Sequence, residues 1–311
     1  MSDLTRFAPA PTGFLHLGHV LNAHSVWTIA RDRGARVLLR VEDHDRERCR
    51  PEYEAALLDD LDWLGFVPDL YPTDDFRRGR CESRQSDRAP IYEEAARELA
   101  ARGRLYGCAC SRADIARVAG MVGGADIARA KNTTGTADIE RAKDTTGTAD
   151  IARALDDAGG SGEIAYPGTC RDLGLPLEPG MAWRVRIDPG DESFDDLLLG
   201  PQRQSPHLQS GDVVIRDRLG NWTYQFVASV DDFRQGIDLV VRGRDLLPST
   251  GRQIQIARLL GRTEPAVFAH HQLIMKSPAQ KLSKSDGDTG VRDLRAAGWT
   301  REDVISAALK T

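Results

Sequence analysis

The stretch RFAPAPTGFLHLGH, residues 6–19, carries the local signals that decide the fold. Pro9 and Pro11 fix the backbone angle φ and remove two hydrogen-bond donors, so this segment is expected to be extended and rigid. Apolar residues then recur at helical spacing from Val20 to Ala30, which predicts a helix that ends near Gly34. We expect a strand, a turn and a helix start, where free N–H groups favour the binding of an anion.

A second motif, KLSKS at residues 281–285, lies far downstream. Two lysines in a small polar loop suit a mobile cationic clamp on phosphate groups. Each motif alone is weak evidence, because His-x-Gly-His arises by chance and a Lys-x-Ser-Lys loop is often only a solvated charged turn.

Together, and in this order, the two motifs resemble the HIGH and KMSKS signatures of class I aminoacyl-tRNA synthetases. The segments LLRVEDHD at 38–45 and VVRGRDLL at 240–247 resemble the glutamate-specific branch of that family, and its shortened members that modify tRNA(Asp) in particular. The resemblance covers nearly all of the chain except residues 113–160.

The pattern of elements agrees with an α/β fold. A strand at 36–42, helices at 51–65 and 87–102, and a polar loop between these helices indicate a parallel, doubly wound sheet. Further downstream we expect short strands at 182–188, 193–199 and 212–216 in a small inserted subdomain. A sheet or helix segment at 221–232, a strand at 238–241, a helix at 250–260, a strand at 267–274 and a capped helix at 304–309 should follow.

The resemblance implies a Rossmann-like (HUP) parallel sheet, interrupted by a zinc-bearing acceptor-side subdomain and lacking an anticodon-binding domain. The expected division is 1–104 for the first half of the catalytic domain, 105–211 for the insertion and 212–311 for the second half. It also implies a first step in which a glutamate carboxylate attacks the α-phosphate of ATP, in the presence of Mg²⁺, and gives glutamyl-adenylate. In the second step glutamate would pass to the queuosine base in the anticodon loop of tRNA(Asp).

By the same resemblance, the catalytic residues would be His16, His19 and Lys284, and ATP would also meet Gly18 and Lys281. L-glutamate would be held by Arg6, Ala10, Glu42, Tyr224 and Arg242. Ala10 stands where the family has a serine, which removes one hydroxyl near the substrate. A purely structural interpretation stays open for two of these residues, since Tyr224 could fill the core and Arg242 could pair with Asp231 or Asp232.

Five cysteines, an odd number that includes a Cys-x-Cys pair, favour a metal over disulfides in an intracellular chain. The resemblance adds Tyr166 and Cys170 to Cys108 and Cys110 as ligands of one structural Zn²⁺. The alternative is a set of free, buried cysteines.

Between these ligands the chain repeats a 12-residue unit four times over residues 113–160, each copy beginning Ala-Asp-Ile. One Ile and a few Ala per unit offer little to bury, so we expect a surface protrusion of short helical turns or a partly disordered loop.

Charge and hydropathy narrow the class of protein. The net charge of −5 argues against a general nucleic-acid coat, although residues 201–311 carry 16 Lys/Arg against 12 Asp/Glu. No run of 18 apolar residues occurs, so we expect no membrane span. The first motif begins at Arg6, which leaves no room for a signal peptide, so we expect a cytoplasmic protein. We also expect a monomer. The alternatives in function are a truncated glutamyl-tRNA synthetase that charges tRNA(Glu), a small-molecule nucleotidyltransferase, and a catalytically silent RNA-binding relative.

Overall fold

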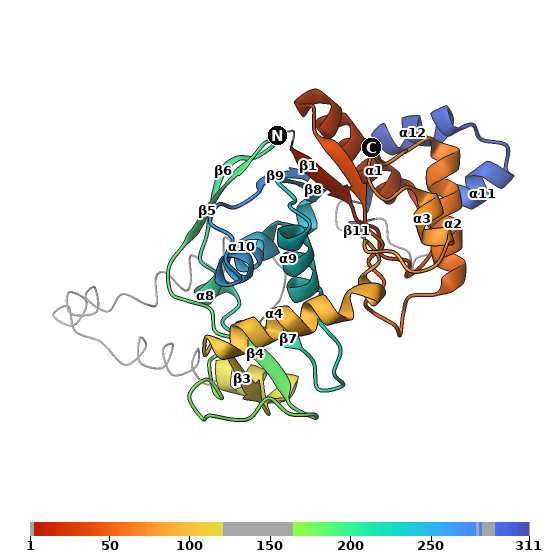
Figure 1. Cartoon of the computed structure of the whole chain (residues 1–311). Coiled ribbons are helices and arrows are strands. Elements are labelled where there is room, and N and C mark those ends of the chain that lie inside the picture. The colour runs from red at the N-terminus through yellow and green to blue at the C-terminus, as the bar shows by residue number, and fades with distance from the viewer. Residues whose placement is uncertain (1–2, 121–163, 278–279, 282–289, 311) are drawn as a thin grey trace.

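A computed structural model describes residues 3–120, 164–277, 280–281 and 290–310. For residues 275–277 and 280–281 it describes the backbone alone. Within these ranges the main sheet has the strand order β2-β1-β8-β9-β5-β6 (Figure 1). Its first five strands run parallel and β6 pairs antiparallel with β5. The strands are β1 (Leu4–Phe7), β2 (Arg36–Leu39), β5 (Glu192–Asp196), β6 (Gly200–Gln204), β8 (Leu239–Gly243) and β9 (Val267–His271).

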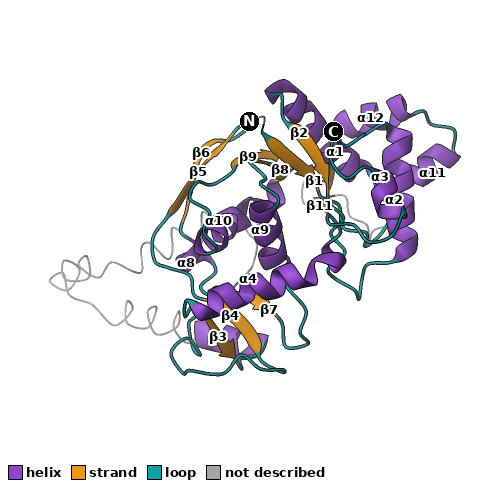
Figure 2. Cartoon of the chain, in the orientation of Figure 1, coloured by secondary structure: helices purple, strands orange, loops and turns teal. Residues whose placement is uncertain are grey.

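Helices cover both faces of this sheet (Figure 2). Side chains such as Phe7 and Val241 join a core with α1, α2, α11 and α12. Their neighbours Leu38 and Val240 point to the other face, toward α10. This two-sided burial is why β2 and β8 are mostly apolar. The helices are α1 (Leu17–Arg33), α2 (Pro51–Leu64), α10 (Thr250–Leu259), α11 (Val291–Ala296) and α12 (Arg301–Leu309).

Local sequence signals fix where these helices begin and end. Gly34 takes the left-handed conformation, with φ 64°, and closes α1 as the sequence predicted. Thr300 and Asp303 form a reciprocal capping box at the start of α12, which confirms the predicted capped helix. Helix α2 begins at Pro51, a position that needs no N–H donor.

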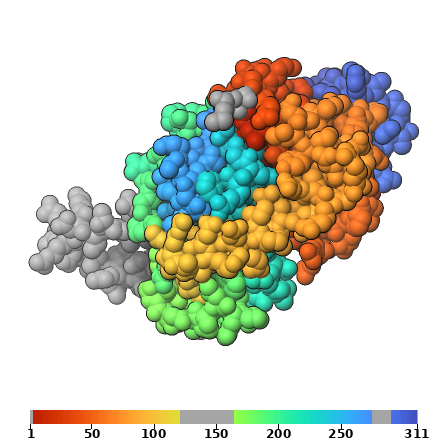
Figure 3. Space-filling model, viewed as in Figure 1, coloured from red at the N-terminus to blue at the C-terminus, as the bar shows by residue number. Residues whose placement is uncertain are grey.

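A second, antiparallel sheet of three strands forms the small subdomain, in the order β3-β4-β7. It packs against α4 and α9, and α4 crosses the surface between this sheet and the rest of the molecule (Figure 3). These elements are β3 (Leu105–Cys108), β4 (Ala182–Val185), β7 (Val213–Arg216), α4 (Ala89–Ala101) and α9 (Tyr224–Arg234). Shorter elements are α3 (Thr73–Arg77), η1 (Gln85–Arg88), α8 (Pro206–Gln209), η3 (Arg244–Ser249), β10 (Met275–Ser277) and β11 (Gln280–Lys281).

Three predictions need correction or completion. Residues 193–199, expected in the small subdomain, instead contribute β5 to the main sheet, where Asp196 pairs with Phe268 of β9. The polar segment 71–88, expected to be a loop, contains α3 and η1. The ambiguous segment 221–232 is helical from Tyr224 onward. Of the repeat region, residues 113–120 are helical and the rest lies outside the described residues.

Within the described ranges, none of the helices combines the length and apolar character that a bilayer span requires.

Candidate active site

The start of α1 brings the two predicted histidines together. Nδ1 of His16 accepts a hydrogen bond from the Gly18 N–H at 3.0 Å, and the His16 N–H donates to Nδ1 of His19 at 3.1 Å. The two ring centroids lie 4.0 Å apart. The imidazoles therefore act as a reciprocal cap and flank the positive end of the helix, where an anion is favoured.

Gly18 is required by this arrangement because the His16 ring lies directly against its backbone. A Cβ at residue 18 would stand 2.9 Å from Cε1 and 3.1 Å from Nδ1 of His16. Any side chain would push the ring away from the helix end. This steric requirement explains why the motif His-x-Gly-His has a glycine at residue 18.

The proline-rich lead-in is held against the residues that follow β2. The Pro9 carbonyl accepts from the Glu42 N–H at 3.0 Å, and the Pro11 carbonyl accepts from the Arg50 N–H at 3.1 Å. Ala10 lies between these two attachments, and its carbonyl accepts from the Thr12 N–H at 2.9 Å. The segment therefore joins the ends of β1 and β2 to the start of α1.

A compact group of charges lies beside this segment. The fully buried Arg40 donates to Oε1 of Glu42 at 2.9 Å and to Oδ1 of Asp232 at 2.8 Å. Nε of Arg6 donates to the same Asp232 oxygen at 3.0 Å, and its Nη1 donates to the Val241 carbonyl at 3.2 Å. Two guanidinium groups and two carboxylates thus balance one another in a region shielded from water.

The pKa shifts report the same grouping. Against the effect of burial, Arg6 and Arg40 lower the pKa of Asp232 to about 2. Burial, and next the Glu42 carboxylate, raise the pKa of Tyr224. Burial lowers the pKa of Arg242. Among its neighbours, Tyr224 raises this pKa and Arg6 lowers it further. The structure therefore brings the predicted residues Arg6, Glu42, Tyr224 and Arg242 into one region.

Arg242 is held by a buried polar network. Its Nε donates to Nε2 of His270 at 3.0 Å, its Nη1 to Oε1 of Gln253 at 2.6 Å, and its Nη2 to Oγ1 of Thr250 at 2.7 Å. Among the described residues, no hydrogen bond or ion pair joins Arg242 to Asp231 or Asp232. Asp231 instead ties α9 to η1 and α4 through Arg88, Gln85 and Tyr92. The direct partners of Arg242 are therefore His270, Gln253 and Thr250, and the alternative pairing with Asp231 or Asp232 finds no bond among the described residues.

The KLSKS motif falls at the limit of what the structure describes. Lys281 ends β11, its side chain is not described, and Lys284 lies outside the described residues. The chain that follows the motif returns to the start of α1. Gly290 forms an isolated antiparallel β-bridge with His16, and the Val291 N–H donates to the Leu15 carbonyl at 2.8 Å.

The predicted metal ligands also meet. The Sγ atoms of Cys108, Cys110 and Cys170 all lie within 4.8 Å of one another. Oη of Tyr166 lies 3.4 Å from Sγ of Cys108 and accepts from the Cys170 N–H at 2.8 Å. Spacings of this size suit thiolates around one tetrahedral ion, in which sulfurs bound at about 2.3 Å are separated by about 3.8 Å.

The electrostatic surroundings of the cluster are compatible with a cation. Against burial, Tyr166 and Arg184 lower the pKa of Cys108. Burial and then the neighbouring thiols of Cys170 and Cys108 raise the pKa of Cys110 to about 11. Thiolates as close as these repel one another, and a divalent metal between them would offset that repulsion. The residues therefore fit a zinc ion.

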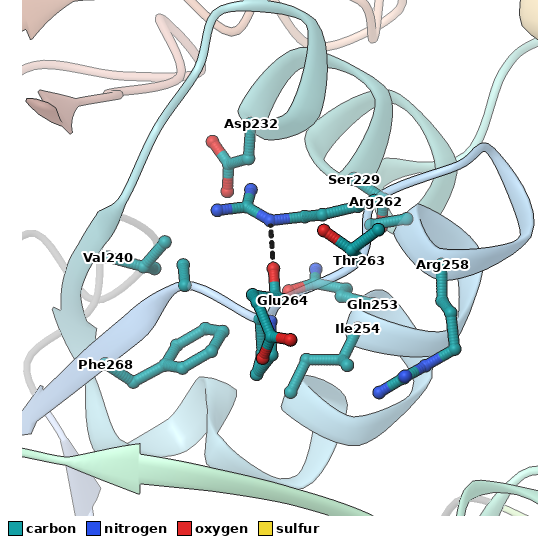
Figure 4. Close-up of a pocket in the computed structure, with 13 residues that line it drawn as sticks. Ser229, Asp232, Val240, Gln253, Ile254, Arg258, Arg262, Thr263, Glu264 and Phe268 are labelled. Atoms are coloured by element: carbon teal, nitrogen blue, oxygen red, sulfur yellow. Dashed lines mark hydrogen bonds between the residues drawn. The ribbon is translucent and has the colours of Figure 1, made fainter.

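A further pocket lies between the main sheet and α10, and its lining includes Asp232 and Gln253 of the polar groups described above (Figure 4). Val240 and Phe268, near the N-terminal ends of β8 and β9, form part of its wall, and Arg262 donates to the Glu264 carbonyl at 2.7 Å. Ligands of doubly wound sheets bind outside the carboxyl ends of the strands. This pocket is therefore a poor candidate for the active site.

Comparison with known proteins connects this geometry to a family. The model of the catalytic domain of class I tRNA synthetases (E and Q) matches residues 4–151 and 178–310. The chain belongs to this family. Class I synthetases of this type are ligases, and so is this protein. Tyr166 and Cys170 fall outside the matched ranges, so their grouping with Cys108 and Cys110 rests on the structure.

Among relatives of this class I synthetase, the glutamyl-Q tRNA(Asp) synthetase of Rhodobacter capsulatus is 35% identical over 97% of this chain and 98% of its own. That of Symbiobacterium thermophilum is 37% identical over 96% and 83%. Glutamate–tRNA ligase 2 of Cereibacter sphaeroides is 35% identical over 96% of this chain and 58% of its own. The glutamate tRNA ligase of Elizabethkingia meningosepticum, solved with its amino acid, superposes with a TM-score of 0.65 at 25% identity, over 93% of this chain and 53% of that one.

Two residues that support the class I synthetase site were not singled out from the sequence. One is His270, which is buried and bonded to Arg242. The other is Arg40, which links Glu42 to Asp232. A buried arginine inside an apolar strand segment is the signal that could have found it, because such a charge requires partners.

Proposed function

We propose that this protein activates L-glutamate with ATP and transfers it to the queuosine base of tRNA(Asp). The observation that carries the first half is the group Arg6, Glu42, Tyr224 and Arg242, which lies beside the histidine-capped start of α1. A substrate with two carboxylates and one ammonium calls for cations and an anion in one shielded place, next to a phosphate site.

In this proposal the ATP phosphates lie at the N-terminus of α1. His16 and His19 flank them, and the absence of a side chain at Gly18 lets the His16 ring lie against the helix start. The glutamate carboxylate attacks the α-phosphorus, the bond to the β-phosphate oxygen breaks, and pyrophosphate leaves. Mg²⁺, bound with ATP, supplies charge neutralisation, and Lys284 with Lys281 stabilises the charge of the departing pyrophosphate.

The amino-acid side of the site has the donors and acceptors that this reaction needs. Oε1 of Glu42 accepts hydrogen bonds from Arg40. Among the described residues no group donates to its Oε2, which leaves an acceptor for the substrate ammonium. Likewise, within the described ranges Arg6 donates from Nε and Nη1, and its Nη2 is available to donate to a carboxylate. Arg6 and Arg242 recognise carboxylate, and Tyr224 lines the pocket between them. Ala10 contributes backbone where a serine hydroxyl is missing, which costs about 0.5–1.5 kcal/mol of binding.

The second half of the proposal rests on the relatives. Six relatives named glutamyl-Q tRNA(Asp) synthetase match at 35–38% identity over 91–97% of this chain. The competing function, charging tRNA(Glu), is suggested by the matches to two glutamate–tRNA ligases.

The test uses purified protein, ATP, Mg²⁺ and radiolabelled glutamate with three acceptors. These are tRNA(Asp) containing queuosine, the same tRNA lacking it, and tRNA(Glu). We expect label on the first alone, released under the conditions that hydrolyse the queuosine ester. Label on tRNA(Glu) would establish the competing function. Absence of both label and glutamate-dependent ATP–pyrophosphate exchange would point to a catalytically silent, RNA-binding relative.

We also propose one structural zinc ion on Cys108, Cys110, Cys170 and Tyr166, which would tie β3 to the segment after the repeats. A monomeric state and a cytoplasmic location stay predictions.

A further inference from the structure

A buried chain of three side chains ends at Arg242. Oδ2 of Asp196 lies 2.5 Å from Nδ1 of His270, and Nε2 of His270 accepts from Nε of Arg242 at 3.0 Å. The three residues are 3%, 1% and 3% exposed. They come from the ends of β5, β9 and β8, three neighbouring strands of the main sheet (Figure 1).

The direction of these bonds follows from the chemistry of the groups. An arginine Nε–H can only donate, so Nε2 of His270 must be the acceptor and carry no proton. The proton of the neutral ring is then on Nδ1 and is donated to Asp196. The carboxylate thus selects the tautomer that Arg242 needs.

Asp196 is itself fixed by the backbone. Its Oδ1 accepts from the N–H groups of Leu198 and Leu199 at 2.9 and 3.0 Å, in the turn between β5 and β6. Oδ2 remains directed at the ring. The orientation of Arg242 is therefore set from the backbone of the turn between β5 and β6.

The surroundings keep His270 neutral. Burial and the positive charges of Arg242 and Arg6 oppose a second proton, and Asp196 alone favours it, so that the pKa of His270 falls to about 4. The Phe268 ring stacks on the imidazole at 5.7 Å between centroids, and the Arg242 guanidinium lies 5.5 Å from the same ring. An uncharged acceptor holds the arginine without neutralising it, which leaves its full charge for a substrate carboxylate.

We infer that Asp196 and His270 are positioning residues that orient Arg242 for recognition of a glutamate carboxylate. The inference rests on the proposed function and deepens it, because it assigns substrate recognition to two residues that lie behind the binding side chain. A merely structural role would change stability and all kinetic parameters together, whereas a positioning role changes the KM for glutamate selectively.

Two substitutions of His270 separate the two halves of the chain. His270→Gln retains an amide oxygen near the position of Nε2, which can accept from Arg242, and loses the donor to Asp196. His270→Asn retains a donor near the position of Nδ1 and loses the acceptor for Arg242. The control is His271→Gln, since His271 is a buried neighbour on β9 whose Nε2 contacts Oδ1 of Asn22 instead.

The measurement is glutamate-dependent ATP–pyrophosphate exchange, with KM determined for glutamate and for ATP, and with the Tm of each variant. We expect His270→Asn to raise the KM for glutamate about tenfold, while His270→Gln raises it about threefold, and the KM for ATP changes less than twofold in both. Selectivity for glutamate over glutamine should fall in the same order. His271→Gln should match the unsubstituted protein.

An unchanged KM for glutamate in His270→Asn, or equal changes in the KM values for glutamate and ATP, would overturn the inference alone. No glutamate-dependent exchange in the unsubstituted protein would overturn the proposed function, and the inference with it. A readout independent of activity is the ¹⁵N spectrum of the histidines, in which His270 should carry its proton on Nδ1 from pH 5.5 to 8. Protonation on Nε2 would contradict the bond to Arg242.

Discussion

At the scale of single residues, Gly18 connects the sequence motif to the geometry of the site most directly. Replacement by alanine would force the His16 ring away, since the new Cβ would lie 2.9 Å from Cε1. We expect Gly18→Ala to lower kcat for ATP–pyrophosphate exchange about 10- to 100-fold with little change in Tm, because alanine favours the helix. Ser25→Ala in the same helix, where the hydroxyl only meets the Leu21 carbonyl, is the control. Normal activity in Gly18→Ala would exclude the steric role.

Lys284 allows a test of the second motif. Its ammonium is assigned to charge that develops on the departing pyrophosphate, so the substitution should act on the chemical step more than on binding. Lys284→Ala should reduce exchange about 100-fold or more at saturating ATP and glutamate, with an unchanged far-UV circular dichroism spectrum. Lys310→Ala, near the end of α12, serves as a control for the loss of one positive charge. An active Lys284→Ala enzyme would remove the lysine from the mechanism.

The residues of the site were partly predictable. The motif residues His16, Gly18 and His19 lie in one short segment, and their spacing alone put them at a helix start. Arg40 and His270 could not be recognised in this way, because their partners come from strands and helices up to 195 residues away in the sequence. Only the assembled sheet shows that Arg40 pairs with Glu42 and Asp232, and that His270 accepts from Arg242.

At the scale of secondary-structure elements, periodicity predicted α1, α2, α4, α10 and α12 with ends within a few residues. Strand segments were found too, but not their sheets. The alternating pattern of residues 192–204 fits either sheet equally well, since the β5–β6 edge of the main sheet also has one buried and one exposed face. Its pairing with β9 is decided by the packing of Phe194 on Phe268, whose ring centroids are 5.1 Å apart.

The small sheet provides a test of the zinc proposal. Cys108 ends β3 while Tyr166 and Cys170 come from a segment without regular structure, so a metal would tie this segment to the strand. We expect one zinc per chain by plasma mass spectrometry, and a loss of zinc with a Tm lower by about 4 °C or more in Cys110→Ser. Cys49→Ser, a half-buried cysteine outside the cluster, should retain both. Absence of zinc from protein purified without chelators would contradict the proposal.

At the scale of the whole molecule, buried ionisable groups determine how stability depends on pH. His270 has a pKa of about 4 in the folded chain, below its ordinary value of 6.5. The unfolded chain therefore binds more protons between pH 6.5 and 4, and stability falls as the pH falls through this window, by up to about 1.4 kcal/mol per pH unit. The pKa of His271 is also lowered by burial, so it acts in the same direction.

Chemical denaturation at pH 7.5, 6.0, 5.0 and 4.5 checks this expectation. The free energy of unfolding should be flat above pH 7 and should decline below 6.5. His270→Gln should flatten the decline, because the substituted side chain does not titrate. An identical pH dependence in the two proteins would show that other groups dominate. Asp232, with a pKa of about 2, contributes only at lower pH.

The order of strands in the main sheet has a consequence for synthesis on the ribosome. Strand β1 lies in the sheet between β2, which follows it within 40 residues, and β8, whose Val241 contacts Arg6 across 235 residues of sequence. At a translation rate of about 5–20 residues per second, β1 waits roughly 10–50 s for that second neighbour. During this interval the nascent chain presents an apolar strand edge with unpaired amides, so we expect its early life to depend on chaperones more than its final stability would suggest.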